Sequence, residues 1–279
     1  VKSADELELL RASTRLNEKV FQSVYATIEP GMTEREIALA LELTMREMGA
    51  EGPSFPTIVA FGTNAARPHA VPTDRELQAG DLVLIDMGLV LRGYCSDLSR
   101  TFVAGRPDPT YIDRHRVVRA AMLAGIGAIR AGVTGAAVDR AARQVIADAG
   151  DGDCFGHSLG QGVGLAVNEA PRLSRANRKK LRAGMVVTVG PGIYLPDWAA
   201  SAWKTWWWWA RTAANSSTTT PPASTSNPAR TADCEEDHVQ QILRPRHQRA
   251  PAQQRRHHLL RRQHRGPAHD GDRGAGQVQ

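Results

Sequence analysis

Cysteine is scarce in this chain, and long apolar runs are missing. Three cysteines occur among 279 residues, and their irregular spacing argues against a disulfide framework. No apolar run is long enough to span a bilayer, and no stretch has the pattern of a signal peptide. We therefore expect a cytoplasmic protein that does not associate with a membrane.

Net charge is also missing from most of the chain, although the whole carries +6. Residues 1–198 contain 23 Lys and Arg and 23 Asp and Glu, so the 12 basic and 6 acidic residues of 199–279 supply the entire excess. Five of the six tryptophans and six of the nine histidines also follow Trp198. This change in composition predicts a domain at 1–198 and a segment of different character at 199–279.

The segment DLVLIDMGLVLRGYCSDLSRTFVAGR at 81–106 has the pattern of two strands joined by a turn at Leu91-Arg92. With that turn, Asp86 lies directly opposite Asp97. Two carboxylates at cross-strand distance repel each other unless a positive charge lies between them, and carboxylates are the ligands that hard cations prefer. The pattern leaves two interpretations open, a site for divalent cations or a pair of exposed aspartates.

Hydrophobic spacing predicts helices at 4–28, 34–48 and 111–130, and strands at 53–62 and 185–189. Thr33 and Glu36 form a capping box for the second helix. The segment IRAGVTGAAVDRAA from Ile129 repeats IEPGMTEREIALAL from Ile28, so that residue 132 matches residue 31 at an offset of 101. This repeat predicts a duplicated half-domain with a pseudo-twofold axis, and sites often form between such halves.

Six motifs within residues 1–198 resemble, in order and spacing, the pita-bread metallopeptidases. This family includes Xaa-Pro aminopeptidases, Xaa-Pro dipeptidases, methionine aminopeptidases and creatinases. The motifs are IVAFGTNAARPHA, LIDMG, SDLSRTF, FGHSLGQGVGL, NEAP and VGPGIY. The RPHA motif around His69 is most similar to the Xaa-Pro peptidase branch. The resemblance implies an α+β pita-bread fold with a pseudo-twofold repeat, and an N-terminal domain before the opening segment VKSADELELLR.

The resemblance also implies two divalent metal ions, of Mn, Co, Zn or Fe, that share a water and hydrolyse an Xaa-Pro peptide bond. By resemblance Asp86 binds one metal, Asp97 bridges both, and His157 binds the second. His69 is the implied catalytic residue at the substrate. The fourth ligand is normally a Glu immediately before Pro-Gly-Ile-Tyr, and this chain has Gly190 there. Because glycine has no ligand atom, we expect a weakened or single metal site.

Two more positions depart from the family pattern. Gln161 and Asn168 stand where His is usual in GHG and HEAP. Asn168 is nevertheless assigned to substrate binding, together with His69. The implied partner is a proline-containing peptide, and a homodimer is left open.

The fifth family ligand is a Glu on a terminal strand, in a pattern like Gly-Gly-Val-Arg-Ile-Glu-Asp that does not follow Trp198 here. Reading the codons one base earlier restores this pattern, because the last base of Trp203 and the first two of Lys204 encode Glu for every codon choice. In the same frame, the run WWWW encodes Val-Val-Val. We therefore interpret residues 199–279 as an out-of-frame and disordered tail, with the terminal strands of the fold missing or replaced.

Plain structural alternatives accompany these assignments. His157 is either a ligand or a buried hydrogen-bonded histidine, His69 is either catalytic or an ordinary loop residue, and Cys95 and Cys154 are expected to be small apolar residues. The basic tail has a rival interpretation as a nucleic-acid module, which the frame argument disfavours. Three functions stay open: an Xaa-Pro peptidase, a catalytically inactive pita-bread binding protein or pseudogene product, and a creatinase-like C–N hydrolase.

Overall fold

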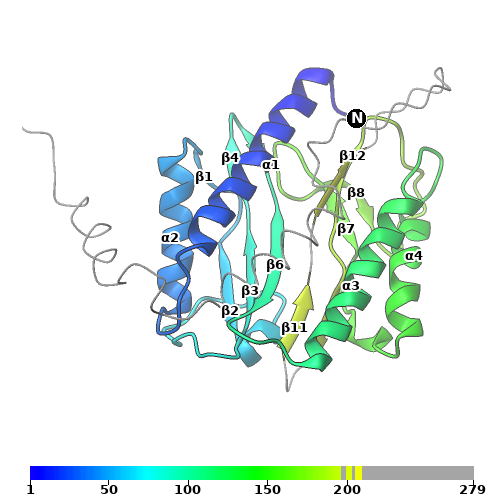
Figure 1. The fold of residues 1–279 in the computed structure, drawn as a ribbon. Helices are drawn as coiled ribbons and strands as arrows, with labels where there is room; N and C mark the ends of the chain where they lie inside the picture. The colour runs from blue at the N-terminus through cyan, green and yellow to red at the C-terminus, as the bar shows by residue number, and fades with distance from the viewer. Residues whose placement is uncertain (196–198, 203–204, 209–279) are drawn as a thin grey trace, which may run out of the picture. The chain divides into compact units, whose positions relative to one another are not determined.

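Two helix pairs flank a set of antiparallel strands in the computed structural model (Figure 1). The model describes residues 1–195, 199–202 and 205–208, all within the first of two units, 1–221 and 222–279. The helices are α1 (Ala4–Tyr25), α2 (Glu34–Glu47), α3 (Pro109–Ala128) and α4 (Gly135–Asp148), with the 3-10 turns η1 (Gly62–Ala66) and η2 (Gly152–Cys154). None of the described helices is both long and apolar enough to cross a bilayer.

The strands in the described part of the chain form four sheets. Their orders are β2-β3-β6, β1-β4-β5, β12-β9-β7-β8 and β10-β11. The strands are β1 (Gly52–Pro53), β2 (Ile58–Phe61), β3 (Leu82–Met87), β4 (Leu89–Leu91), β5 (Tyr94–Cys95), β6 (Leu98–Val103), β7 (Gly160–Gly162), β8 (Glu169–Leu173), β9 (Val186–Val189), β10 (Gly192–Leu195), β11 (Ala199–Ala202) and β12 (Thr205–Trp208).

Two of these strands follow residue 198, where composition predicted a domain boundary. β11 pairs with β10, and β12 pairs with β9. Backbone from beyond the predicted boundary therefore stands at the edge of two sheets. The boundary itself stays a prediction, and residues 209–279, which hold most of the predicted tail, lie outside the described residues.

The core consists mainly of one apolar cluster for each helix pair. In α2, Ile37, Leu41 and Met45 recur every four residues and pack in one cluster with apolar side chains of β3. In α4, the corresponding stripe contains Val138, Ala142 and Ile146, which share a second cluster with side chains of β9. Spacing of four residues places each stripe on one helix face, which is why each helix buries that face against strands.

The predicted repeat is visible in the backbone. α2 and α4 begin and end at positions that differ by 101, and the glycines before them, Gly31 and Gly132, have φ of +90° and +87°. Each of these glycines donates its N–H to a leucine carbonyl, Leu77 in the first half and Leu181 in the second. The predicted capping box at Thr33 is present as well. The structure thus confirms the duplicated arrangement.

The register of the central hairpin differs from the prediction. Asp86 pairs with Ser99 and not with Asp97, because the turn is at Arg92-Gly93 and not at Leu91-Arg92. Both turn residues have positive φ, +52° and +76°. A two-residue turn of this kind matches the twist of a hairpin and favours glycine, so Gly93 belongs inside the loop. Moving the turn by one residue shifts the pairing by two and places Asp97 before the start of β6.

Candidate functional site

Asp86 lies near the end of β3, the central strand of its sheet. It pairs with Ile58 of β2 on one side and with Ser99 of β6 on the other. The Ser99 hydroxyl donates a hydrogen bond of 2.7 Å to Asp86 Oδ1. The strand pairing and this hydroxyl together hold the carboxylate at a defined position in the sheet.

Asp97 is 1% exposed, and its carboxylate receives a hydrogen bond from the second half of the molecule. Gln161 Nε2, on β7, donates to Asp97 Oδ2 over 3.0 Å. The backbone N–H of Gln161 in turn donates to Thr188 Oγ1 of β9 at 3.2 Å. β7 and β9 approach so closely that a Cβ on Gly160 would lie 1.9 Å from the Thr188 carbonyl oxygen. The Gln161 side chain thus places an amide donor against Asp97 where the family usually has histidine.

His157 lies in the loop between η2 and β7. Its Nδ1 is 2.9 Å from the Ser158 carbonyl oxygen, and its ring packs edge to face between Phe155 and Tyr194, with centroids 4.9 Å and 5.4 Å away. Gly190 is buried and donates its N–H to the carbonyl of Leu159 in the same loop, over 2.7 Å. Residue 190, where the resemblance leads us to expect a Glu, is therefore next to the His157 loop.

His69 and Asn168 lie away from these contacts. His69 is exposed in the loop between η1 and β3, and Asn168 is exposed just before β8. Among the described residues, no hydrogen bond joins either side chain to Asp86, Asp97 or His157. Their roles at a substrate stay predictions.

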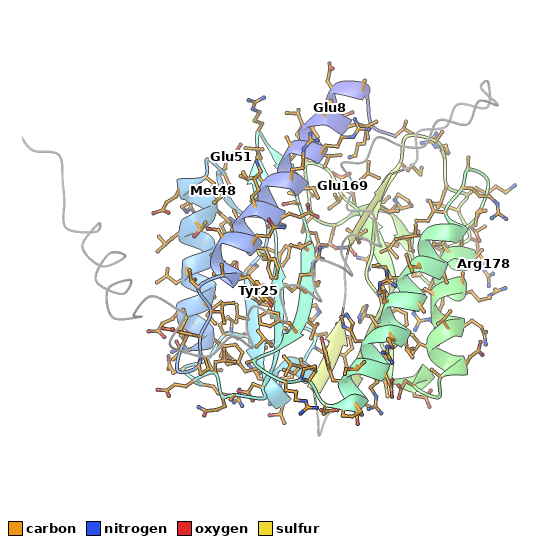
Figure 2. All side chains as sticks on the ribbon, in the orientation of Figure 1. Glu8, Tyr25, Met48, Glu51, Glu169 and Arg178 are labelled. Atoms are coloured by element: carbon orange, nitrogen blue, oxygen red, sulfur yellow. The ribbon has the colours of Figure 1, made fainter. Side chains whose placement is uncertain are left out.

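An ion pair ties the segment before α1 to the start of β8. Lys2 Nζ forms a 2.7 Å ion pair with Glu169, which lies beside α1 (Figure 2). Burial alone raises the pKa of Glu169, but the hydrogen bonds from Lys2 and from the Ala166 N–H outweigh it and lower that pKa. Cys95 is nearby and donates to the Leu165 carbonyl at 3.5 Å. Burial raises the pKa of its thiol, which argues against a nucleophilic role.

Within the described part of the chain, the donor set falls short of a site for two cations. Asp86, Asp97 and His157 have suitable donor atoms, but Gly190 contributes none, and an amide donor faces Asp97. In residues 1–195, 199–202 and 205–208, no three His, Cys, Asp or Glu side chains come together as a potential metal cluster.

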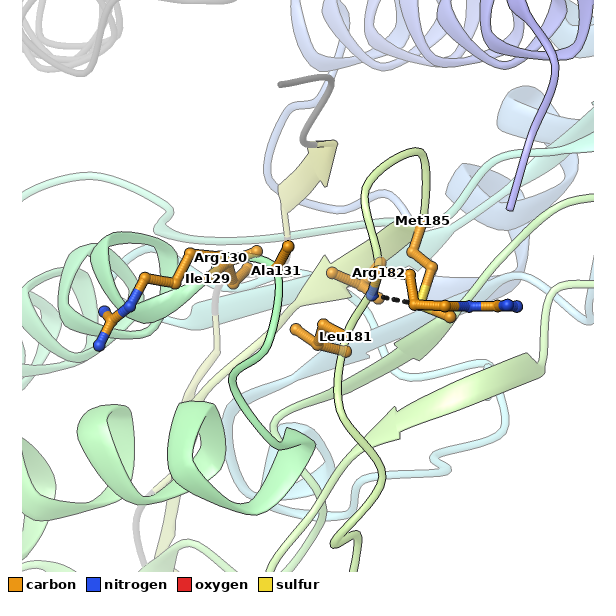
Figure 3. Close-up of a pocket in the computed structure, with 7 residues that line it drawn as sticks. Ile129, Arg130, Ala131, Leu181, Arg182 and Met185 are labelled. Atoms are coloured by element: carbon orange, nitrogen blue, oxygen red, sulfur yellow. Dashed lines mark hydrogen bonds between the residues drawn. The ribbon is translucent and has the colours of Figure 1, made fainter. Parts of the chain in front are cut away.

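A separate small hollow lies where α3 connects to α4 (Figure 3). Its lining residues are Ile129, Arg130, Ala131, Leu181, Arg182, Met185 and Val187. The Arg182 N–H donates to Met185 Sδ across it, at 3.3 Å. The lining contains no carboxylate, histidine or cysteine, so this hollow is not the candidate site.

Sequence reasoning missed three charged residues that bind the loops in which the candidate histidines lie. Glu34 of α2 and Asp139 of α4 are completely buried, and Arg143 forms an ion pair with Asp139. A signal was present for Asp139 and Arg143, because Asp139 directly follows Val138 of the apolar stripe and lies four residues before Arg143. A carboxylate beside a buried stripe, with a cation one turn on, indicates a buried ion pair.

Together, the duplicated helix pairs, the aspartates of the central hairpin and the histidine loop define a pita-bread α+β protein. The chain belongs to metallopeptidase family M24, whose family model matches residues 8–219. Solved structures agree with this. An X-Pro aminopeptidase from Thermotoga maritima is 39% identical with a TM-score of 0.73, and the match covers 74% of this chain and 58% of that one. A prolidase from Pyrococcus furiosus is 36% identical with a TM-score of 0.74, over 75% and 62%.

Curated relatives give the same family. An Xaa-Pro dipeptidase from Pyrococcus horikoshii is 39% identical over 196 residues, which is 70% of this chain and 56% of that protein. An uncharacterised peptidase from Bacillus subtilis is 40% identical over 197 residues, or 71% and 56%. The chain thus spans a little over half the length of the curated relatives that it matches.

Proposed function

We propose that this chain is the catalytic region of an Xaa-Pro peptidase, of the aminopeptidase or dipeptidase type, with an incomplete catalytic site. The names of its relatives support the reaction, and a proline-containing peptide is the proposed substrate. The observation that carries the proposal of incompleteness is the contact between Gly190 and the His157 loop. A Glu at residue 190 would place a carboxylate next to this loop, and glycine has no side chain to do so.

The proposed site of the intact enzyme holds two divalent metal ions, which supply the hydrolytic chemistry. In this chain we expect weak binding of Mn²⁺, Co²⁺, Zn²⁺ or Fe²⁺ and little or no hydrolysis. Loss of a group in the outer shell of a metal site commonly costs about 10- to 100-fold in affinity or activity, and a lost ligand costs at least that. The inferred frameshift also removes the Glu of the terminal strand, which would be a second lost metal ligand.

Four forms of the chain test this proposal: the present sequence, Gly190→Glu, a one-base frame correction at Trp198, and both changes together. We expect tight binding of two metal ions and Xaa-Pro hydrolysis only in the fourth form. Metal stoichiometry by calorimetry and cleavage of an Xaa-Pro dipeptide are the measurements. Full activity in the present sequence would show that the ligand assignment is wrong. Inactivity of the fourth form, if it is folded, would refute the peptidase proposal.

A non-catalytic binding protein is the second candidate, and the bond from Gln161 to Asp97 favours it. The amide gives this buried carboxylate a hydrogen bond that needs no cation. A Gln161→His variant distinguishes the two functions. If the present chain binds a proline-containing dipeptide without cleaving it, and Gln161→His abolishes that binding, the binding function is correct.

A further inference from the structure

The repeated helices α2 and α4 each bury one carboxylate that faces a loop with a candidate histidine. Glu34 begins α2, and Asp139 lies in the second turn of α4; both are 0% exposed. Helices α2 and α4 lie on opposite sides of the strands (Figure 1). The carboxylate in each half therefore serves a different loop.

Glu34 binds both ends of the loop that contains His69. Its Oε1 accepts the Phe61 N–H at 2.7 Å, and its Oε2 accepts the Thr73 N–H at 2.8 Å and the Thr73 hydroxyl at 2.7 Å. The Asn64 side-chain amide also donates to this carboxylate, at 2.9 Å and 3.1 Å. One buried carboxylate thus closes the loop from 61 to 73, and His69 lies within it.

Asp139 binds the loop that contains His157, and it does so together with Arg143. Arg143 makes a two-pronged ion pair with Asp139, at 2.9 Å and 3.0 Å. The same guanidinium donates to the carbonyls of Phe155 at 2.6 Å and His157 at 2.8 Å, while Asp139 Oδ1 accepts the Leu159 N–H at 3.1 Å. Every second residue of this loop is therefore fixed to α4.

Aromatic packing also connects Arg143 to the His157 ring, through Phe155. The Arg143 guanidinium carbon lies 4.0 Å from the centre of the Phe155 ring. The Phe155 ring in turn meets the His157 ring edge to face. Backbone and ring of His157 thus both depend on the position of Arg143.

All groups that face these two carboxylates are donors. A carboxylate satisfies them with both oxygens, whereas an amide must turn its NH₂ group toward a donor on one side. Charge-assisted hydrogen bonds are also stronger than neutral ones. Replacement of Glu34 by Gln, or of Asp139 by Asn, therefore releases part of one loop and leaves the helix intact.

We propose that Glu34 is the positioning residue for His69, and that Asp139 with Arg143 positions His157, one device in each half of the repeat. The effect of this positioning on hydrolysis rests on the proposed function. The loop anchoring itself does not depend on it.

Hydrogen exchange of backbone amides in the full chain tests the anchoring. The variants are Glu34→Gln and Asp139→Asn, with Arg143→Lys as a milder change in case Asp139→Asn does not fold. Glu47→Gln and Asp148→Asn are matched controls, because both residues are exposed on the same two helices. The amides of Phe61, Thr73 and Leu159 report on the two loops, and those of β3 report on global unfolding.

We expect Glu34→Gln to raise exchange at residues 61 and 73 by about tenfold or more, with residue 159 unchanged. Asp139→Asn and Arg143→Lys should raise exchange within 155–159 and leave 61–73 unchanged. The controls should change neither loop. Equal acceleration in both loops and in β3 would mean that these residues only stabilise the fold, and no acceleration in either loop would also overturn the proposal.

Catalysis provides a second, separable measurement. In the chain with both Gly190→Glu and the frame correction, Glu34→Gln and Arg143→Lys should each lower kcat/KM by about 10- to 100-fold, since small misplacement of a reacting group has effects of that size. If the corrected chain itself is inactive, the proposed function fails while the exchange pattern still decides the anchoring. If the corrected chain is active and both variants hydrolyse equally well, the positioning proposal fails while the function stands.

Discussion

The molecule has two halves, one with α1 and α2 and the other with α3 and α4. Their backbones are arranged alike, but the side chains at matching core positions differ. Val24 and Leu41 of the first half correspond, at the offset of 101, to Gly125 and Ala142 of the second. A Cβ on Gly125 would lie 3.3 Å from the Ala142 Cβ, so the helices of the second pair leave no space between them there. The repeat thus preserves the bounds of α2 and α4 and the glycine turns before them, while the side chains between the paired helices differ in volume.

Removing the larger side chain of the first half should have the largest effect. Leu41 is 0% exposed, so Leu41→Ala leaves a cavity and should lower the free energy of unfolding by about 2–5 kcal/mol. Urea denaturation measures this loss. Leu39→Ala, at a position that is 56% exposed on the same helix, is the control and should change stability by less than about 0.5 kcal/mol. A similarly small effect at Leu41 would show that the core of the first half is loosely packed.

The second half should also respond to acid through His115, which stands where the first half has Thr14. Burial, and then the charge of Arg119, lower the pKa of His115 from 6.5 to about 4. The unfolded chain therefore binds this proton first, and the stability that is complete above pH 6.5 is lost as the pH falls toward 4. The shift corresponds to at most about 3 kcal/mol.

A His115→Gln variant should lose that part of the pH dependence. Thermal or urea unfolding between pH 7 and pH 4 provides the curves to compare. His69→Gln, at a histidine exposed in a loop, is the control for the exchange of histidine for glutamine. Parallel curves for His115→Gln and the parent chain would contradict the assignment.

Leucine at residue 142, as at the matching residue 41 of the first half, should destabilise the fold. Ala142→Leu places a large side chain against Gly125, Leu159 and Val189, which already crowd this point, and it should cost about 1–3 kcal/mol of unfolding free energy. Ala120→Leu, at an exposed position of α3, is the matched control for the change in helix composition. A stabilising Ala142→Leu would show that the second pair can open to the spacing of the first.

The smallest effect concerns the helix N-termini. Thr33 and Glu36 form a reciprocal capping box, whereas Thr134 has Ala137 in the place of the glutamate. Ala137→Glu should complete the second box and add about 0.5 kcal/mol to stability. Glu36→Ala should remove a similar amount from the first half. If Ala137→Glu is neutral while Glu36→Ala is destabilising, the two N-termini are less alike than their backbones suggest.

The fold and the candidate site were predictable in part. Features that depend on residues close in sequence were predicted correctly, whereas the strand pairing was not. The helix predicted at 34–48, the box at Thr33 and the match of residue 31 with residue 132 are local signals, and the structure confirms each of them. The hairpin register was wrong because one turn residue, Gly93, was placed outside the loop. Because the turn sets which residues of a hairpin lie opposite each other, moving it by one residue shifts every predicted pair by two.

Local pattern in the sequence by itself determined the helices, the duplication and the family motifs, because each depends on neighbouring residues. Only the tertiary structure decided that Gln161 meets Asp97 across 64 positions of sequence, and that Glu34 closes a loop 27 to 39 positions away. Spacing along the chain carries no information about such distances. They are set when the core of each half packs and its strands pair, which brings polar groups from separate segments within hydrogen-bond reach.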